Sequence, residues 1–224
     1  MIPWVLLDSA KIPGSNELRL WQRGEEFSIR LGRDELMNSR IHGSEEELAA
    51  LACERVGDRA VPTLLIGGLG MGFTLRAALD ALKVESKIVV AELMPAVIAW
   101  NKGPLARLTG NSLEDPRVRL VEGDVGETIR AQADAYDAIL LDVDNGPEGL
   151  TRAANDGLYD LDGLAAARTA LKANGVLLVW SAGEDQKFTQ RLRRSGFEVE
   201  VVRTRARGAR GGAKHVIWMA TRVG

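Results

Sequence analysis

A short apolar segment followed by a run of glycines constrains the fold of this chain more than any other feature. Residues 64–72 read LLIGGLGMG and lead into the amphipathic stretch FTLRAALDAL. The pattern predicts a strand, a tight turn at Gly68, close backbone approach to a ligand at Gly70, and a helix packed on its strand at Gly72. Glu92 ends the next apolar run, where a carboxylate can hold ribose hydroxyls. Together these features indicate a nucleotide-binding site.

Strand and helix patterns alternate from residue 62 onwards, which predicts an α/β fold with helices on both faces of a mostly parallel sheet. Seven strands are expected, at residues 63–67, 87–92, 118–123, 136–142, 175–181, 198–202 and 215–220. No helical pattern separates the last two strands, so they are expected to form an antiparallel hairpin. This ending is typical of the Rossmann-like methyltransferase sheet and argues against a nicotinamide dehydrogenase.

The region before the glycine turn predicts a small β lobe and a helix. Three short strand patterns occur, at residues 4–7, 17–22 and 26–31. A helix is expected to start near Glu45, with Ser44 and Glu47 spaced as a capping box. We therefore expect an N-terminal β lobe and linker over residues 1–43, and a Rossmann-like nucleotide-binding domain over residues 44–224.

Composition excludes several classes of protein. The 224 residues are 46% hydrophobic and 27% charged, as in ordinary globular proteins, and no apolar run reaches the roughly twenty residues of a membrane span. The N-terminus lacks a basic leader, so a cytoplasmic protein is expected. Cys53 is the single cysteine and the histidines lack metal-ligand spacing, so neither a disulfide nor a metal site is expected. Sequence motifs of hydrolases and NTPases are also absent.

Basic residues and glycines are concentrated in one C-terminal segment, residues 203–214. The net charge of the chain is −2, so the rest of the chain is acidic. We interpret the segment as a solvated loop between the last two strands, with contact to RNA phosphates as the alternative. A nucleic-acid partner is therefore not the leading expectation.

The strand ends supply polar groups to one edge of the predicted sheet, where ligands bind in such folds. In this region the chain resembles the spermidine synthase family of aminopropyltransferases, which have the S-adenosylmethionine methyltransferase fold and a small N-terminal β lobe. IGGLGMG stands in place of the family's GGGDGG, AEL in place of its acid-x-acid, and EGD in place of its GD. YDAILLDVDNGP likewise corresponds to YDxIxxDSxDPxGP.

The resemblance implies roles for residues that match these motifs. Glu92, followed by Leu93, would bind the ribose hydroxyls. Asp124, after Gly123, would bind the adenine amino group, with Val125 lending its backbone amide. The resemblance also implies a homodimer.

Other residues are implied at the reacting end of the site. Asp142 would line the pocket beside the sulfonium. Arg40 and His42 fall in the segment that corresponds to the family's pocket-covering loop, and could contact the donor or the acceptor. Tyr159 aligns with an aromatic residue that follows the catalytic loop, with core packing as the alternative.

The first departure from the family lies in the glycine loop, where Gly70 replaces an acid. An acid there suits the bare propylammonium of decarboxylated S-adenosylmethionine, whose burial without a partner is costly. S-adenosylmethionine itself carries a carboxylate, which glycine amides at a helix N-terminus suit better. This replacement favours S-adenosylmethionine as the cofactor.

The second departure lies in the catalytic stretch, where the family's DSxDPxGP is shortened to DVDNGP. The shorter segment leaves a gap in the alignment with the family's motif. If the gap falls before Asp144, Asp144 is the acid that accepts the amine proton. If it falls after Asn145, Asn145 replaces that acid. Loss of that acid makes aminopropyl transfer less expected. Methyl transfer relies mainly on alignment of the nucleophile with the sulfonium, so it tolerates an asparagine there.

These observations predict an S-adenosylmethionine-dependent methyltransferase that acts on a small amine or similar nucleophile, with Asp142, Asp144 and Asn145 as candidate catalytic residues. The first alternative is an aminopropyltransferase that uses decarboxylated S-adenosylmethionine and a diamine such as putrescine. The others are an RNA-directed methyltransferase and a nucleoside-binding module without catalysis.

Overall fold

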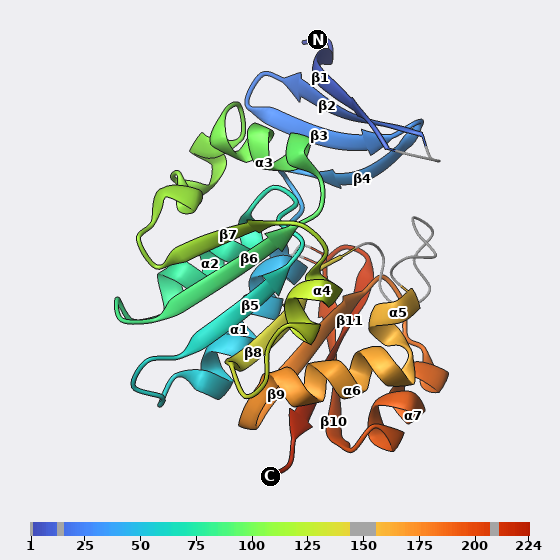
Figure 1. Cartoon of the computed structure of the whole chain (residues 1–224). Coiled ribbons are helices and arrows are strands. Elements are labelled where there is room, and N and C mark those ends of the chain that lie inside the picture. The colour runs from blue at the N-terminus through green and yellow to red at the C-terminus, as the bar shows by residue number, and fades with distance from the viewer. Residues whose placement is uncertain (1, 13–15, 144–155, 207–210) are drawn as a thin grey trace.

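The computed structural model describes residues 2–12, 16–143, 156–206 and 211–224. They form two β-sheets, of which the smaller, antiparallel sheet lies above the larger one (Figure 1). The smaller sheet has the order β1 (Val5–Lys11), β2 (Glu17–Arg23), β3 (Glu26–Leu31), β4 (Asp34–Asn38). The expected β lobe is therefore present. The sequence reasoning missed β4, which lies largely in the segment read as a linker.

The larger sheet has seven strands in the order β10-β11-β9-β8-β5-β6-β7. Its strands are β5 (Thr63–Gly67), β6 (Lys87–Glu92), β7 (Val118–Glu122), β8 (Tyr136–Leu141), β9 (Leu171–Ser181), β10 (Phe197–Arg205) and β11 (Lys214–Arg222). Strands β5 to β9 pair in parallel, and β11 runs antiparallel to both β9 and β10. The predicted sheet with its terminal hairpin is confirmed. The chain order reverses between β5 and β8, which is where such folds bind ligands.

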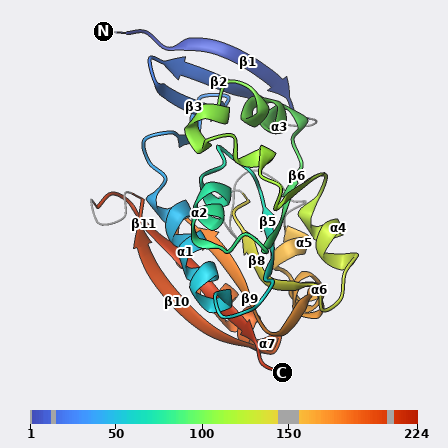
Figure 2. The same ribbon diagram turned by 90° about the vertical axis from the view of Figure 1, so that its left-hand side faces the viewer.

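Helices cover both faces of the larger sheet (Figure 2). They are α1 (Gly43–Val56), α2 (Phe73–Ala81), α3 (Pro95–Lys102), α4 (Val125–Arg130), α5 (Asp156–Tyr159), α6 (Leu161–Ala170) and α7 (Gln186–Arg194), with short 3₁₀ turns at Ala106–Thr109 and Ser112–Glu114. Alternate strand residues face opposite sides: Leu64 and Ile66 pack with α1, α2 and α3, whereas Leu65 packs with α4 to α7. Of the described helices, none has the length and apolarity required to cross a membrane.

The start of α1 differs from the sequence prediction. The helix begins at Gly43, after His42, and no side chain caps it. Ser44 lies inside the first turn, and its hydroxyl donates to the Glu45 carboxylate at 2.7 Å rather than capping the helix with Glu47. The capping-box prediction is therefore wrong. The same hydroxyl also lies 3.0 Å from Nδ1 of His215, so strand β11 is what holds Ser44 in this position.

A side-chain hydrogen bond joins the small sheet to the larger domain. The indole Nε1 of Trp100 in α3 donates to Asp8 of β1 at 2.7 Å, and the Trp100 ring is buried. Phe27 and Ile29 of β3 belong to the same hydrophobic core as α1 and α3. The small sheet therefore packs on the domain through a continuous apolar core. The division of the chain at residue 43 stays a prediction.

Asp137 in β8 is buried among charged partners. Its carboxylate lies 2.5 Å from Nη1 of Arg59 and 2.7 Å from Nζ of Lys172, and it accepts the backbone N–H of Thr63 at 2.6 Å. Only 2% of the Asp137 side chain is exposed. Asp137 therefore joins β5, β8 and β9 at the edge opposite the candidate site.

We expect Asp137→Asn to lower the free energy of unfolding by about 3 kcal/mol, because it removes the buried negative charge that pairs with Arg59 and Lys172 and accepts the N–H of Thr63. Asp134→Asn is the matched control. Asp134 pairs with Arg222 at 2.6 Å but is 67% exposed, so its loss should cost less than about 1 kcal/mol. Urea unfolding of the two variants measures the difference. Equal losses would contradict the structural role of Asp137.

Candidate active site

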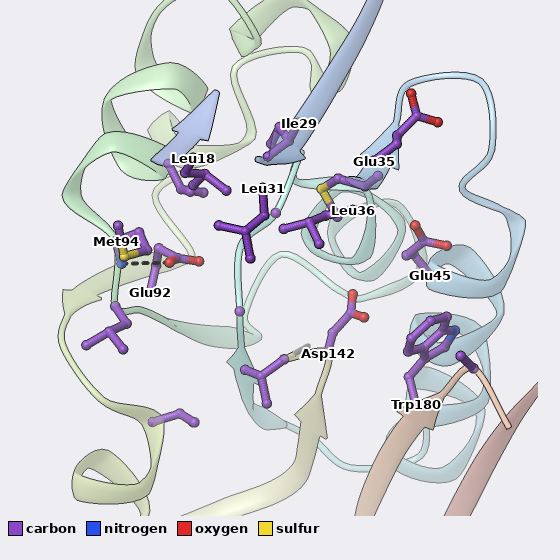
Figure 3. A pocket seen from close by; sticks show the side chains of 18 of the residues that line it. Leu18, Ile29, Leu31, Glu35, Leu36, Glu45, Glu92, Met94, Asp142 and Trp180 are labelled. Carbon is purple, nitrogen blue, oxygen red and sulfur yellow. Dashed lines mark hydrogen bonds between the residues drawn. The ribbon is translucent and has the colours of Figure 1, made fainter. Parts of the chain in front are cut away.

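A cavity of about 420 Å³ lies between the carboxyl edge of the larger sheet and the small N-terminal sheet. Its floor comes from the ends of β5, β6, β7 and β8. Its roof is mostly apolar and comes from β2, β3 and β4 (Figure 3). The roof residues are Leu18, Ile29, Leu31, Leu36 and Met37. The sheet topology thus brings most of the predicted nucleotide-binding residues into one pocket.

The glycine turn after β5 forms part of the cavity wall through Gly68 and Gly70. Gly68 has φ +88°, and a Cβ built there would lie 2.5 Å from the carbonyl oxygen of Asp142. A side chain at this position would therefore displace the end of β8. Glycine at position 68 allows the turn to lie directly against the strand that carries Asp142.

Gly70 is covered by the N-terminal sheet. Its φ is +52°, and a Cβ built there would lie 2.7 Å from Cε of Met37 in β4. The apolar methyl group of Met37 therefore occupies the space into which an acidic side chain at position 70 would project. This contact was invisible in the sequence, because β4 was not predicted.

Glu92 lies at the end of β6 and lines the cavity with Leu93. Its two carboxylate oxygens accept the backbone N–H groups of Leu69 and Met94, each at 2.8 Å. Burial raises the pKa of Glu92, and the backbone hydrogen bonds oppose that shift. The carboxylate is thus held in place by the glycine turn at the wall of the cavity.

The end of β7 contributes Gly123, Asp124 and Val125 to the same cavity. Asp124 is the N-cap residue of α4, and its carboxylate accepts the N–H of Glu127 at 3.1 Å. This bond orients the Asp124 side chain beside the start of the helix. Glu92 and Asp124 therefore lie at the ends of neighbouring strands, as the sequence predicted.

Asp142 and Glu45 form a second acidic region, on the side of the cavity away from Glu92 (Figure 3). The Asp142 carboxylate accepts the Thr74 hydroxyl at 2.7 Å, and burial raises the pKa of Asp142. Burial, followed by the nearby Asp142 charge, raises the pKa of Glu45 to about 7. Two carboxylates that share a desolvated space disfavour ionisation of each other, as at many acid–base sites.

The carboxyl side chains of acidic residues dominate the polar lining of the cavity. Five carboxyl side chains line the cavity, from Glu35, Glu45, Glu92, Asp124 and Asp142, whereas its described lining includes no lysine or arginine. Across the described part of the chain, no cluster of histidine, cysteine and acidic residues has an arrangement that could hold a metal ion. The cavity is therefore suited to a ligand that carries positive charge.

Several residues predicted for the site lie elsewhere. Gly72, which precedes α2, does not line the cavity. Arg40 and His42 do not line it either. Arg40 lies 3.7 Å from Glu26, and the ring of His42 stacks on Phe73 with centroids 4.2 Å apart. The structure therefore does not bring these residues into the pocket, and Glu45 of α1 lines it instead.

Tyr159 is buried outside the cavity lining but contacts its wall. Its hydroxyl donates to the carbonyl of Val143 at 3.5 Å, and its ring packs edge-on against Phe188. Core packing, the alternative interpretation, therefore describes its surroundings well. Asp144 and Asn145 lie outside the described residues.

Among the lining residues that the sequence reasoning missed are Glu35, Glu45, Trp180 and His215. Glu45 was detectable as an acid in the segment that corresponds to the family's covering loop. Trp180 and His215 come from the ends of β9 and β11, and no local motif marks them. The indole nitrogen of Trp180 is buried without a hydrogen-bond partner among the described residues.

Comparison with known proteins agrees with this geometry. A family model described as the spermine/spermidine synthase domain matches residues 45–195. A polyamine aminopropyltransferase of Korarchaeum cryptofilum is 29% identical over 120 residues, which cover 54% of this chain and 35% of the relative. One of Mycobacterium tuberculosis is 33% identical over 134 residues, 58% of this chain and 24% of the relative. The matched part thus spans a quarter to a third of these curated relatives.

Among solved structures, a spermidine synthase from Thermotoga maritima has a similar fold. The two structures superpose with a TM-score of 0.73 at 20% identity, and the match covers 97% of this chain and 72% of the other. Both the small N-terminal sheet and the larger sheet therefore fall within the matched region.

The raised pKa of Glu45 predicts a pH-dependent effect on stability. The folded protein binds a proton at Glu45 more tightly than the unfolded chain does, so ionisation destabilises the fold as the pH rises from about 4.5 to about 7. Above that range, Glu45→Gln should raise Tm by about 2–4 °C, which corresponds to roughly 1 kcal/mol for a partly exposed group. At pH 5 the gain should nearly vanish.

Glu54→Gln is the matched control, because Glu54 lies in the same helix and is exposed. It should give no gain in Tm at pH 8.5. Thermal unfolding at pH 5 and 8.5 measures both variants. A gain for Glu45→Gln that is the same at both pH values would contradict the proposed electrostatic cause.

Proposed function

Because the chain belongs to the spermine/spermidine synthase family, we propose that it is an aminopropyltransferase. In this proposal it transfers the aminopropyl group of decarboxylated S-adenosylmethionine to the nitrogen of a small amine. The observation that carries the proposal is the charge of the cavity, with five carboxyl groups and no lysine or arginine among the described residues that line it. The names of the matched relatives support the same reaction.

This proposal replaces methyl transfer, the function predicted from Gly70. That prediction relied on the exposed amides of the glycine loop as partners for the carboxylate of S-adenosylmethionine. In the structure, Met37 covers Gly70. A ligand carboxylate buried near Asp142 and Glu45 would add a third negative charge without a described cation to offset it. The bare ammonium of the decarboxylated donor suits this lining better.

The proposed placement of the donor follows the polar groups at the strand ends. Glu92 would accept hydrogen bonds from the ribose hydroxyls, beside Leu93. Asp124 and the backbone after Gly123 would bind the adenine, with the amide of Val125. The sulfonium end would then extend towards Asp142 and the acidic side of the cavity.

In the proposed reaction, the lone pair of the acceptor nitrogen attacks the methylene carbon next to the sulfonium. A C–N bond forms, the C–S bond breaks, and the bond's electron pair leaves with sulfur as 5′-methylthioadenosine. The attacking nitrogen becomes positively charged and gives one proton to a carboxylate. Asp142 would orient the amine, and Glu45, with a pKa near 7, is suited to accept the proton at neutral pH.

Three other expectations stay predictions: a homodimer, a cytoplasmic location, and the catalytic roles of Asp144 and Asn145. The acceptor is named only by class, as a small amine. The Arg/Gly-rich segment is partly outside the described residues, and its described strands belong to the terminal hairpin. RNA-directed methyl transfer therefore has no supporting observation.

A turnover assay tests the proposal. The purified protein is incubated with a diamine and either donor, and products are identified by mass spectrometry. We expect 5′-methylthioadenosine and an aminopropylated amine from the decarboxylated donor. A methylated amine from S-adenosylmethionine, with no aminopropyl product, would overturn the proposal.

Asp142→Asn should lower kcat on the order of 10²-fold or more, because it removes the carboxylate that orients the amine while keeping an oxygen for Thr74. Glu122→Gln is the matched control. Glu122 is an exposed acid at the same edge of the sheet and does not line the cavity. Steady-state kinetics of both variants measure the effect, and equal rates in Asp142→Asn and the control would exclude a catalytic role for Asp142.

A further inference from the structure

The cavity wall around Asp142 and Glu45 is largely apolar. In Figure 3 the side chains of Leu36, Glu45 and Trp180 lie around the Asp142 carboxyl group. Leu36 is 41% exposed although its side chain is large and apolar, so it presents a surface that a ligand can cover. The apolar residues of this side, called the apolar wall below, are Leu36, Ile41, Val143, Trp180 and Ala182.

The Glu35 carboxyl group also lines the cavity, but it is already paired within the small sheet. It accepts the Ser28 hydroxyl at 2.7 Å and the side-chain amide of Asn38 at 2.8 Å. The side-chain oxygen of Asn38 in turn accepts the backbone N–H of Arg40 at 3.1 Å. Figure 3 shows the Glu35 carboxyl group pointing away from Asp142. Glu35 and Asn38 therefore bind each other and their neighbours rather than a ligand beside Asp142.

Ser44 and His215 add polar atoms to this side of the cavity but no charge. The Ser44 hydroxyl donates to Glu45 at 2.7 Å, and its oxygen lies 3.0 Å from Nδ1 of His215. Burial lowers the pKa of His215, so its ring is neutral at neutral pH. The Trp180 ring packs edge-on against this imidazole, with centroids 4.8 Å apart. Among the described residues, the charges available to an amine on this side are therefore those of Asp142 and Glu45.

We infer that the site prefers an acceptor with a single amino group on an apolar body. The nitrogen of this acceptor lies at Asp142 and Glu45, and its carbon chain lies against the apolar wall, chiefly Leu36 and Trp180. The inference rests on the proposed aminopropyl transfer and names the class of amine that receives the group. A diamine is the poorer acceptor in this account, not an excluded one.

The cost of desolvation is the physical reason for the preference. The second ammonium of a diamine would leave water beside Leu36 and Trp180, where no described carboxylate is available to pair with it. A cation over an indole ring recovers only a small part of that cost. The ammonium of the donor already requires negative charge from Asp142 or Glu45. A methyl group in the same place gains free energy from burial.

The transfer step needs no further reactant. The lone pair of the amine nitrogen attacks the methylene carbon next to the sulfonium, so that a C–N bond forms and the C–S bond breaks. The electron pair of the broken bond stays on sulfur in 5′-methylthioadenosine, and one proton passes from the nitrogen to a carboxylate. With pentylamine as acceptor, the other product is aminopropylated pentylamine.

Two acceptors of the same size test the preference. Putrescine and pentylamine have the same number of non-hydrogen atoms, and a terminal ammonium in putrescine replaces a methyl group in pentylamine. With the decarboxylated donor at saturation, we expect kcat/KM to be about tenfold or more higher for pentylamine. The measurement follows 5′-methylthioadenosine and the aminopropylated amine by mass spectrometry. Equal values, or a higher value for putrescine, would overturn the inference.

A carboxylate placed in the apolar wall should change the preference. Ala182 is exposed at the end of β9, so the fold should tolerate a longer side chain there. Ala182→Glu offers the second ammonium a partner, and we expect the kcat/KM ratio to shift about tenfold or more towards putrescine. Ala182→Gln is the matched control, with the same shape and no charge, and should leave the ratio nearly unchanged. Equal shifts in the two variants would contradict selection by charge.

Calorimetry separates this inference from the proposed function, because it needs no turnover. The unmodified protein, loaded with 5′-methylthioadenosine, is titrated with pentylamine and with putrescine. Tighter binding of pentylamine with no product from either amine would overturn the proposed function and support the apolar acceptor site. Aminopropyl transfer with a preference for putrescine would support the proposed function and overturn the inference. Binding of neither amine would also overturn the inference.

Discussion

The site depends on the close approach of the glycine turn after β5 to the end of β8. A Cβ at Gly68 would meet the carbonyl oxygen of Asp142 at 2.5 Å, so only glycine allows this packing at the observed φ of +88°. The same turn donates the N–H of Leu69 to Glu92. The same turn therefore holds the Glu92 carboxylate in place and lies directly against the backbone of Asp142.

The small sheet gives these carboxylates their chemical character. Its leucines and Met37 cover the carboxyl edge of the larger sheet and remove water from it. Desolvation raises the pKa values of Asp142 and Glu45. In the proposed reaction, this acidic side of the cavity binds the cationic end of the donor and accepts the amine proton. The roof thus covers the site with apolar side chains and adds one carboxyl group, that of Glu35 in β4, to the described lining.

Much of the fold could be predicted from the sequence, because alternation of buried strands and amphipathic helices is a local signal. Glu92, Asp124 and Asp142 could be placed at the cavity because the ends of parallel strands meet at one edge. The contribution of β4 and α1 could not be predicted in the same way. Met37 reaches Gly70 only through packing of one sheet on the other, and Glu45 lines the cavity from the first turn of α1. The preference for S-adenosylmethionine arose because this contact was missing from the sequence reasoning, which judged Gly70 without its cover by Met37.

The central claim is that an acidic cavity without a described lysine or arginine selects a cationic donor. Isothermal titration calorimetry of the unmodified protein with decarboxylated S-adenosylmethionine and with S-adenosylmethionine, at pH 8 and equal ionic strength, tests it most directly. The account predicts that the decarboxylated form binds about tenfold more tightly or better, a difference of roughly 1.4 kcal/mol. Equal affinity, or tighter binding of S-adenosylmethionine, would contradict it.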